Sequence, residues 1–370
     1  MHPVYPQNNS NNMVLRPAIP TMSLGQPGTH SLPSKLQEAS LHGFEAIELF
    51  ITDLEHLAST TFNNDNLAAA KHVRALCKTV NLSIICLQPF LFQEGLVDRS
   101  PQTQNNITRK LLHWFDIAHA LGTDLIQVPS NFLPPDPETK CPRTSGDIDL
   151  IVSDLQHFAD LGAQQNPPIR FVYEALAWGN HVCTWEQCYD IVLRVNRPNL
   201  GICLDTFHIL GWVYADPESP SGVRCRAEQD LHESLERLRR TVDPSKVFYV
   251  QVVDGVRLAA PLDEKHEFYV EGRPSRMNWS RNARLFAFEE DRGGYLPVLE
   301  VVKAFLDTGF TGWVSLELFS RYLADPAPGV PREYARRGMV SWEKLLRKLG
   351  LYSSGSSFAG EDSLTMMHRL

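Results

Sequence analysis

Residues 169–205 read IRFVYEALAWGNHVCTWEQCYDIVLRVNRPNLGICLD and contain two short apolar runs on either side of a longer segment. The runs, IRFVYE (169–174) and LGICLD (200–205), are nearly continuous in apolar residues, which is typical of strands covered on both faces. The segment at 184–196 spaces its apolar residues three and four apart, as one face of a helix requires. This stretch therefore predicts two parallel strands joined by a helix.

The same alternation extends over most of the chain. Eight runs with the length and β-branched content of strands occur at 18–24, 44–50, 82–88, 124–130, 169–174, 200–205, 247–254 and 312–319. Segments of helical length occur at about 33–42, 66–80, 104–121, 147–163, 184–196, 226–241, 296–308 and 333–349. Repeated strand–helix units predict a (β/α)8 TIM barrel. An open Rossmann-like sheet is the alternative, but no G-x-G-x-x-G follows the first strand.

A single catalytic domain is expected over residues 15–352. The Asn- and Pro-rich residues 1–14 and the Ser- and Gly-rich residues 353–370 have no apolar periodicity to bury. They are therefore predicted to be a disordered N-terminal end and a flexible C-terminal tail.

The composition of the 370 residues excludes several classes of protein. Hydrophobic residues make up 43%, too many for a disordered chain, and 35 basic against 43 acidic residues give a net charge of −8. An acidic chain favours neither nucleic acid nor an anionic membrane as partner, which leaves a small molecule as the expected substrate. Seven cysteines without CxxC pairs, and no secretory signal, predict a cytoplasmic protein with reduced thiols. The sequence leaves open whether the chain forms a homo-oligomer.

Polar residues at the ends of four strands predict the functional site, because active sites of such barrels lie at the carboxyl ends of the strands. They are Glu174, Asp205, Gln251 and Glu317. Three converging carboxylates repel one another unless a cation lies between them. An all-oxygen set suits Mg²⁺, Mn²⁺ or Co²⁺ better than zinc. His208, three residues after Asp205, is a candidate acid or base beside that metal.

A long segment, 254–296, follows the seventh strand and is rich in arginine. Long loops of compact domains are often lids or binding elements, although a solvated basic surface is the simpler interpretation. The residues that could hold a substrate carboxylate are Arg276, Arg281 and Arg284, with Trp279 as an apolar wall.

Several of these segments resemble a known enzyme family. They are YEALAWGNHV (173–182), LDTFH (204–208), VQVVD (250–254), NWSRNARLF (278–286) and SLELF (315–319). They are similar to segments of 3-dehydroshikimate dehydratases, within the xylose isomerase-like superfamily of sugar phosphate isomerases and epimerases. PTMSLG, HGFEAIELF and GTDLIQVPSNF (122–132) resemble the fungal, quinate-pathway form. The resemblance extends over roughly residues 17–350.

The resemblance assigns roles residue by residue. It implies metal ligands at Glu174, Asp205, Gln251 and Glu317, and catalytic residues at His208, Glu174 and Glu317. The predicted substrate-binding residues are Arg281, Arg284 and Trp279 of the loop, together with His181 and Gln88. Bacterial members carry arginines where this chain has Leu91 and Asn180, so part of the carboxylate recognition is expected to differ.

The activity that the resemblance implies is the metal-dependent conversion of 3-dehydroshikimate to protocatechuate and water, in quinate or shikimate catabolism. The α-proton would be removed, with a metal-stabilised enolate, and the β-hydroxyl would leave. Two alternatives are a keto-sugar isomerase or epimerase of the same superfamily and an inactive metabolite-binding barrel. In the sugar enzymes a histidine commonly replaces Gln251, and the intact acids argue against an inactive barrel.

Overall fold

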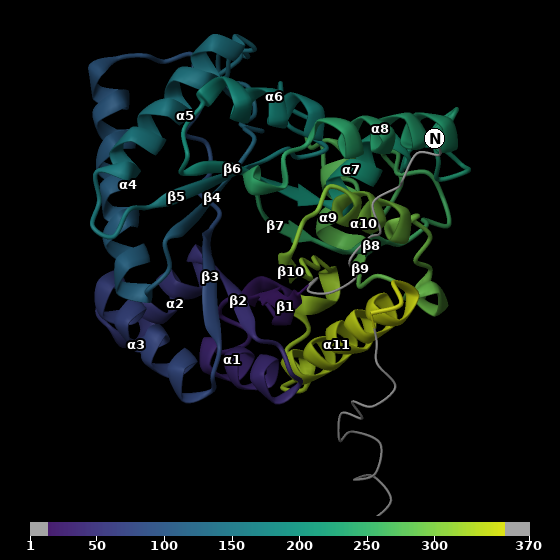
Figure 1. The fold of residues 1–370 in the computed structure, drawn as a ribbon, viewed down its shortest axis with the longest axis horizontal. Helices are drawn as coiled ribbons and strands as arrows, with labels where there is room; N and C mark the ends of the chain where they lie inside the picture. The colour runs from purple at the N-terminus through teal and green to yellow at the C-terminus, as the bar shows by residue number, and fades with distance from the viewer. Residues whose placement is uncertain (1–13, 352–370) are drawn as a thin grey trace, which may run out of the picture.

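Residues 14–351, which the computed structural model describes, form a closed barrel of eight parallel strands surrounded by helices (Figure 1). The barrel strands are β1 (Leu15–Pro20), β2 (Ala46–Phe50), β3 (Ser83–Gln88), β4 (Leu125–Pro129), β5 (Arg170–Glu174), β6 (Leu200–Asp205), β7 (Val247–Gln251) and β10 (Gly312–Ser315). Their order around the barrel follows the chain, and β1 closes the ring by pairing with β10. The predicted (β/α)8 TIM barrel is confirmed.

Parts of two predictions fall outside the described residues. The predicted disordered end, 1–14, lies there except for its last residue, and the predicted tail, 353–370, lies there completely. Within residues 14–351, no helix is both long enough and apolar enough to cross a lipid bilayer.

The barrel interior is built in layers, because residues two apart on a strand point to the same face. The lower layer is an apolar cluster made of Cys86, Leu125, Val172, Cys203 and Tyr249. Two residues further along the same strands is a polar layer made of Gln88, Gln127, Glu174, Asp205 and Gln251, each at most 2% exposed. The strands therefore place polar side chains at their carboxyl ends, above a closed apolar floor.

Helices cover the outside of the barrel, and most correspond to predicted segments. These are α1 (Leu32–Leu41), α3 (Asn66–Thr79), α4 (Pro101–Leu121), α5 (Ile148–Ala163), α6 (Trp185–Val195), α8 (Ala227–Thr241), α10 (Val298–Asp307) and α11 (Val330–Lys348). Local sequence fixes their ends. Thr184 and Gln187 form a reciprocal capping box at the start of α6, and Gly122 ends α4 in the left-handed region at φ 79°.

Three strand predictions were too long: the run at 312–319 ends at Ser315 in β10, and the structure shows the reason for the other two. The run at 18–24 leaves the sheet at Pro20 because Thr21–Leu24 forms a 3₁₀ helix. Its side chains bond other strand ends instead, with Thr21 Oγ1 accepting from the Phe50 amide at 3.1 Å. The run at 247–254 leaves the barrel at Gln251, and β8 (Asp254–Gly255) then pairs antiparallel with β9 (Arg284–Leu285).

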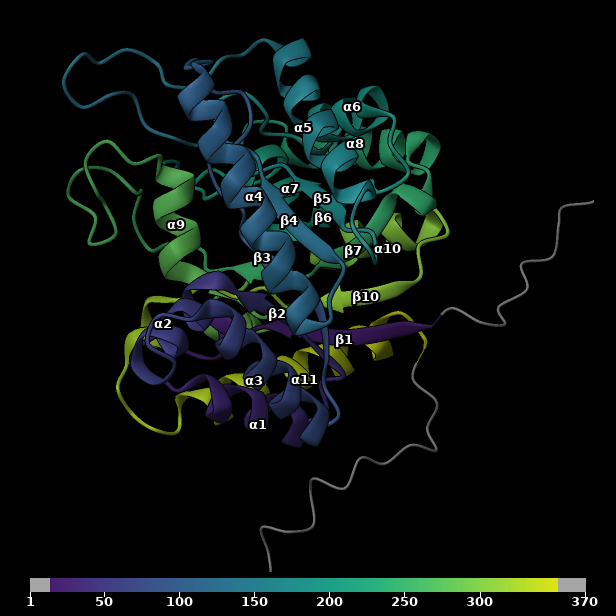
Figure 2. The same ribbon diagram turned by 90° about the vertical axis from the view of Figure 1, so that its left-hand side faces the viewer.

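Three helices were not predicted: α2 (Ile51–Thr61), α7 (Thr206–Val213) and α9 (Ser275–Ala283). The helix α9 interrupts the long segment after the seventh strand. In Figure 2, β1 runs from right to left and α9 lies on the left, the side on which the barrel strands end. The arginine-rich segment is therefore beside the mouth of the barrel, where a site is expected.

Candidate active site

The strand-end acids come together at the barrel mouth, as the sequence predicted. Glu174, Asp205 and Gln251 are the last residues of β5, β6 and β7, and Glu317 lies two residues past the end of β10. All four are buried, with exposures from 0 to 4%. Three carboxylates are thus concentrated in a small volume from which water is largely excluded.

Burial dominates the electrostatics of these acids. It raises the pKa of Glu174 well above its ordinary value, and the charges of Glu317 and Asp205 add to the shift. Burial raises the pKa of Glu317 to about 8 and also raises that of Asp205, although Arg284 opposes both shifts. The ionised cluster therefore requires positive charge close to it.

Arg284 supplies that charge from the protein itself. Its side chain is 1% exposed, and Nη1 donates to Asp205 Oδ2 at 3.0 Å and to Glu317 Oε2 at 3.2 Å. Ser280 Oγ accepts from Nε at 2.9 Å. Arg284 begins β9, so the β8–β9 pairing directs this arginine into the mouth. The sequence placed it in a substrate-binding loop, whereas the structure places its guanidinium among the acids.

His208 lies on α7 beside the same acids. Its Nε2 is 3.4 Å from Asp205 Oδ2 and 3.9 Å from Glu174 Oε1. Burial lowers the pKa of the ring well below its ordinary value, and the charge of Arg284 adds to the effect. The Ala177 amide donates to Nδ1 at 3.0 Å, while Arg284 Nη2 lies 3.0 Å from Nε2. A neutral imidazole has one acceptor nitrogen, so these two donors compete for it.

The donor atoms of this cluster fit a metal ion. Ligand atoms of Glu174, Asp205 and His208 lie within 4.8 Å of one another. Glu174 Oε1 and Gln251 Oε1 are buried and have no hydrogen-bond partner within residues 14–351. Unpaired buried acceptors are unfavourable, and a cation would satisfy them. This group contains His208, which was predicted to act beside the metal, and two of the four predicted ligands.

Three residues of the site escaped the sequence analysis. Glu48, on β2, is fully buried, and Gln127 Nε2 donates to Glu174 Oε2 at 2.9 Å. The Trp178 ring lies 4.8 Å from that of His208, centre to centre, and its buried Nε1 has no acceptor among the described residues. The signal for Glu48 was the single acid in the otherwise apolar strand AIELF (46–50), part of the predicted run FEAIELF.

The predicted substrate-binding residues occupy different positions. Gln88 lies in the polar layer, with Nε2 donating to Glu317 Oε1 at 3.2 Å. Arg281 is exposed on α9 and has no hydrogen-bond or ion-pair partner among residues 14–351. Trp279 is buried against Phe207, with ring centres 4.6 Å apart, and His181 lies 3.1 Å from Thr144 Oγ1. Their contact with a substrate stays a prediction.

Arg276, another candidate from the loop, bonds to the protein. Its Nε donates to the Gly211 carbonyl oxygen at 2.6 Å, and its guanidinium lies over the Trp212 ring. Of the three loop arginines, Arg281 is therefore the one that has no hydrogen-bond or ion-pair partner in the described chain.

A closed parallel barrel with acids and a histidine at its mouth defines a class of metal-site barrels, and comparison with known families shows which of them this chain resembles. Residues 36–344 match the family model described as the xylose isomerase-like TIM barrel. This chain belongs to that family.

Two curated relatives identify the group within the family. The chain is 49% identical over 350 residues to the 3-dehydroshikimate dehydratase of Neurospora crassa, which covers 91% of this chain and 95% of the relative. It is 31% identical over 305 residues to the 3-dehydroshikimate dehydratase of Pseudomonas putida. That alignment covers 82% of this chain and 38% of the relative, which is much longer. The predicted resemblance to 3-dehydroshikimate dehydratases is confirmed.

Solved structures agree on the fold. A fusion of a xylose isomerase-like TIM barrel with a 4-hydroxyphenylpyruvate dioxygenase aligns with TM-score 0.67 and 28% identity, over 94% of this chain and 46% of the fusion. The probable 3-DHS dehydratase AsbF of Bacillus anthracis aligns with TM-score 0.58 and 18% identity, over 89% of this chain and 98% of AsbF. At 18% identity, AsbF supports the fold alone.

Proposed function

We propose that this chain is a 3-dehydroshikimate dehydratase that releases protocatechuate and water. The observation that carries the proposal is the 49% identity to the Neurospora crassa enzyme over nearly the full length of both chains. The cluster of Glu174, Asp205 and His208 at the barrel mouth supports it, since dehydration of a keto acid requires acid and base groups at one place.

We further propose that the site works with one divalent cation. Glu174, Asp205, Gln251 and Glu317 would hold it through oxygen atoms, a set that suits Mg²⁺, Mn²⁺ or Co²⁺. When bound, the cation polarises a carbonyl group and so makes the neighbouring C–H bond more acidic. The unpaired acceptors Glu174 Oε1 and Gln251 Oε1 support this assignment.

His208 is the proposed carrier of the proton. It takes the proton from the carbon next to the carbonyl and returns it to the β-hydroxyl, which leaves as water. A second proton then moves from a ring carbon to the former carbonyl oxygen, which becomes a phenol hydroxyl as the ring becomes aromatic. Nε2 is the nitrogen beside the acids, so a basic Nε2 requires the resting proton on Nδ1. The Ala177 amide occupies Nδ1, and the proposal therefore requires that hydrogen bond to break.

The carboxylate of the substrate needs a cationic partner at the mouth. Arg281 is the proposed one, because this exposed residue has no hydrogen-bond or ion-pair partner within the described chain, and Arg284 is engaged with Asp205 and Glu317. Gln88, Trp279 and His181 remain proposed contributors to substrate binding. Trp178 Nε1, a buried donor near His208, is a further candidate for a substrate oxygen.

The experiment that tests the function compares substrates. Purified protein is incubated with Mn²⁺ and either 3-dehydroshikimate or a panel of keto-hexoses, and products are identified by chromatography and mass spectrometry. We expect protocatechuate from 3-dehydroshikimate and no change in the sugars. Isomerised or epimerised sugar would establish the sugar enzyme instead, and binding without turnover of any compound would establish a metabolite-binding barrel.

A further inference from the structure

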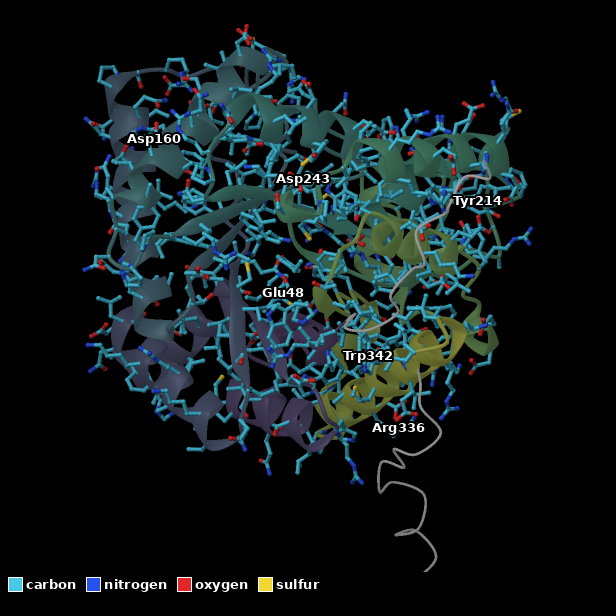
Figure 3. The ribbon with its side chains drawn as sticks, in the orientation of Figure 1. Glu48, Asp160, Tyr214, Asp243, Arg336 and Trp342 are labelled. Carbon is cyan, nitrogen blue, oxygen red and sulfur yellow. The ribbon has the colours of Figure 1, made fainter. Side chains whose placement is uncertain are left out.

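Glu48 is a buried acid inside the barrel that is not one of the four predicted metal ligands. It lies on β2 with no exposed surface, and Figure 3 shows it near the middle of the molecule. Its Oε2 accepts from Gln88 Nε2 at 2.6 Å and from the Tyr249 hydroxyl at 2.7 Å. Gln251 Nε2 lies 3.2 Å from both Glu48 oxygens. Protein donors thus face both oxygens of the carboxylate. Because these oxygens are already hydrogen-bonded, Glu48 is not assigned as a metal ligand.

The Glu48 carboxylate determines which way the Gln251 amide points. An amide side chain has a donor end and an acceptor end, and a carboxylate only accepts. Gln251 therefore turns Nε2 toward Glu48, and its Oε1 points away, buried and without a partner among residues 14–351. Without the carboxylate, either end of the amide could face β2.

A neighbouring ligand is arranged by the same principle. Gln127 Nε2 donates to Glu174 Oε2 at 2.9 Å, which leaves Glu174 Oε1 unpaired. Gln88 extends the effect of Glu48, because its Nε2 donates both to Glu48 Oε2 and to Glu317 Oε1 at 3.2 Å. One buried acid on β2 is thus hydrogen-bonded to Gln251 directly and to Glu317 through Gln88.

We propose that Glu48 is a positioning residue of the metal site, which holds the Gln251 amide with its oxygen toward the cation and Glu317 in place through Gln88. This inference rests on the proposed divalent cation. Partners that orient metal ligands in this way typically change metal affinity by ten- to a hundred-fold when they are replaced.

A purely structural role of Glu48 predicts the opposite pattern. A buried carboxylate is unfavourable for folding, and its replacement by a neutral group of the same shape is often neutral or stabilising. Glu48→Gln keeps the size but offers Gln251 both a donor and an acceptor, so the Gln251 amide loses its fixed orientation. The two roles are therefore separated by measuring metal affinity and thermal stability on the same protein.

The test is Mn²⁺ binding to the full chain by isothermal titration calorimetry, together with the melting temperature of the metal-free protein. For Glu48→Gln we expect affinity to fall roughly ten- to a hundred-fold, with an unchanged or higher melting temperature. Gln251→Ala should also weaken binding, and adding Glu48→Gln to it should cost clearly less affinity than Glu48→Gln does in the wild type, because only the connection to Glu317 through Gln88 is then left to lose. Glu94→Gln is the matched control, since Glu94 is an equally buried acid with no hydrogen bond to a predicted ligand.

Each outcome separates the two proposals. If the wild-type protein binds no Mn²⁺, Mg²⁺ or Co²⁺, the proposed cation is wrong. If it binds metal and Glu48→Gln binds equally well, or if the two replacements have additive effects, the role of Glu48 is wrong while the cation stands. Should Glu48→Gln not fold, Glu48→Asp withdraws the carboxylate by one methylene, and unchanged affinity in that variant would equally overturn the role of Glu48.

Discussion

Arg284 offers a prediction whose size follows from its contacts. Replacing it by methionine keeps much of the side-chain volume and removes a guanidinium that donates to Asp205 at 3.0 Å and to Glu317 at 3.2 Å. Loss of one partner from a buried ion pair usually lowers the free energy of unfolding by about 3–5 kcal/mol. Here we expect the lower end of that range, because burial already raises the pKa of Glu317 to about 8, and removing Arg284, which opposes this shift, lets the acid stay protonated and uncharged.

Bound metal should reduce this loss. A cation at the mouth neutralises the same acids as Arg284, so these acids should bind the cation more tightly once the arginine is gone. Excess metal then stabilises the variant more than the wild type, by about 1.4 kcal/mol for each tenfold gain in affinity. Metal-free Arg284→Met should therefore lose about 3 kcal/mol relative to wild type. The metal-saturated variant should lose half of that or less.

The assay is urea unfolding at pH 7.5, followed by tryptophan fluorescence, with a chelator or with excess Mn²⁺. Arg281→Met is the matched control, because Arg281 is exposed and has no partner within residues 14–351; its effect should stay within about 0.5 kcal/mol. Equal losses for Arg284→Met with and without metal would refute the reasoning, as would no loss in the metal-free protein.

Three further predictions concern single residues and the domain. Burial raises the pKa of Asp254 from 3.8 to about 6, so its contribution to stability is full below pH 3.8 and is lost as the pH rises through 6. Asp254→Asn keeps the Oδ1 that accepts three backbone amides, and should stabilise the protein at pH 7.5 by up to about 3 kcal/mol, with no gain at pH 3.5 in urea unfolding. His208→Ala should bind Mn²⁺ normally in calorimetry but lose at least about 100-fold in turnover, and a near-normal rate would end its assignment as base. Residues 15–352 expressed alone should keep the wild-type melting temperature and turnover, and loss of either would show that the ends belong to the domain.

The barrel and much of its site could be predicted because the signals were local. Continuous apolar strands ending in an acid, as at Glu174 and Asp205, show both the element and its functional end. The α7 segment, TFHILGWV, follows β6 without a polar break and is apolar on most sides, so no helical periodicity marked it. Glu48 was overlooked because it lies inside its apolar run and not at the end of it. Gln127 was overlooked because a neutral amide within a strand carries no charge that would mark a site.

The role of Arg284 depends on tertiary structure. Three arginines occur within nine residues of the loop, and nothing in their spacing distinguishes the one that enters the mouth. The antiparallel pairing of β8 with β9 selects Arg284, because this pairing fixes the position of the first residue of β9 beside the barrel mouth. Pairings of two residues each are too short to be seen in a sequence pattern.

The rate of protocatechuate formation from 3-dehydroshikimate, before and after metal is removed, tests the central proposal most directly. Purified protein is treated with a chelator, dialysed, and assayed alone and with Mg²⁺, Mn²⁺ or Co²⁺. The proposal predicts negligible turnover of the metal-free protein and recovery with at least one of the three ions at about one ion per chain. Equal turnover with and without the chelator, or no aromatic product with any of the ions, would contradict it.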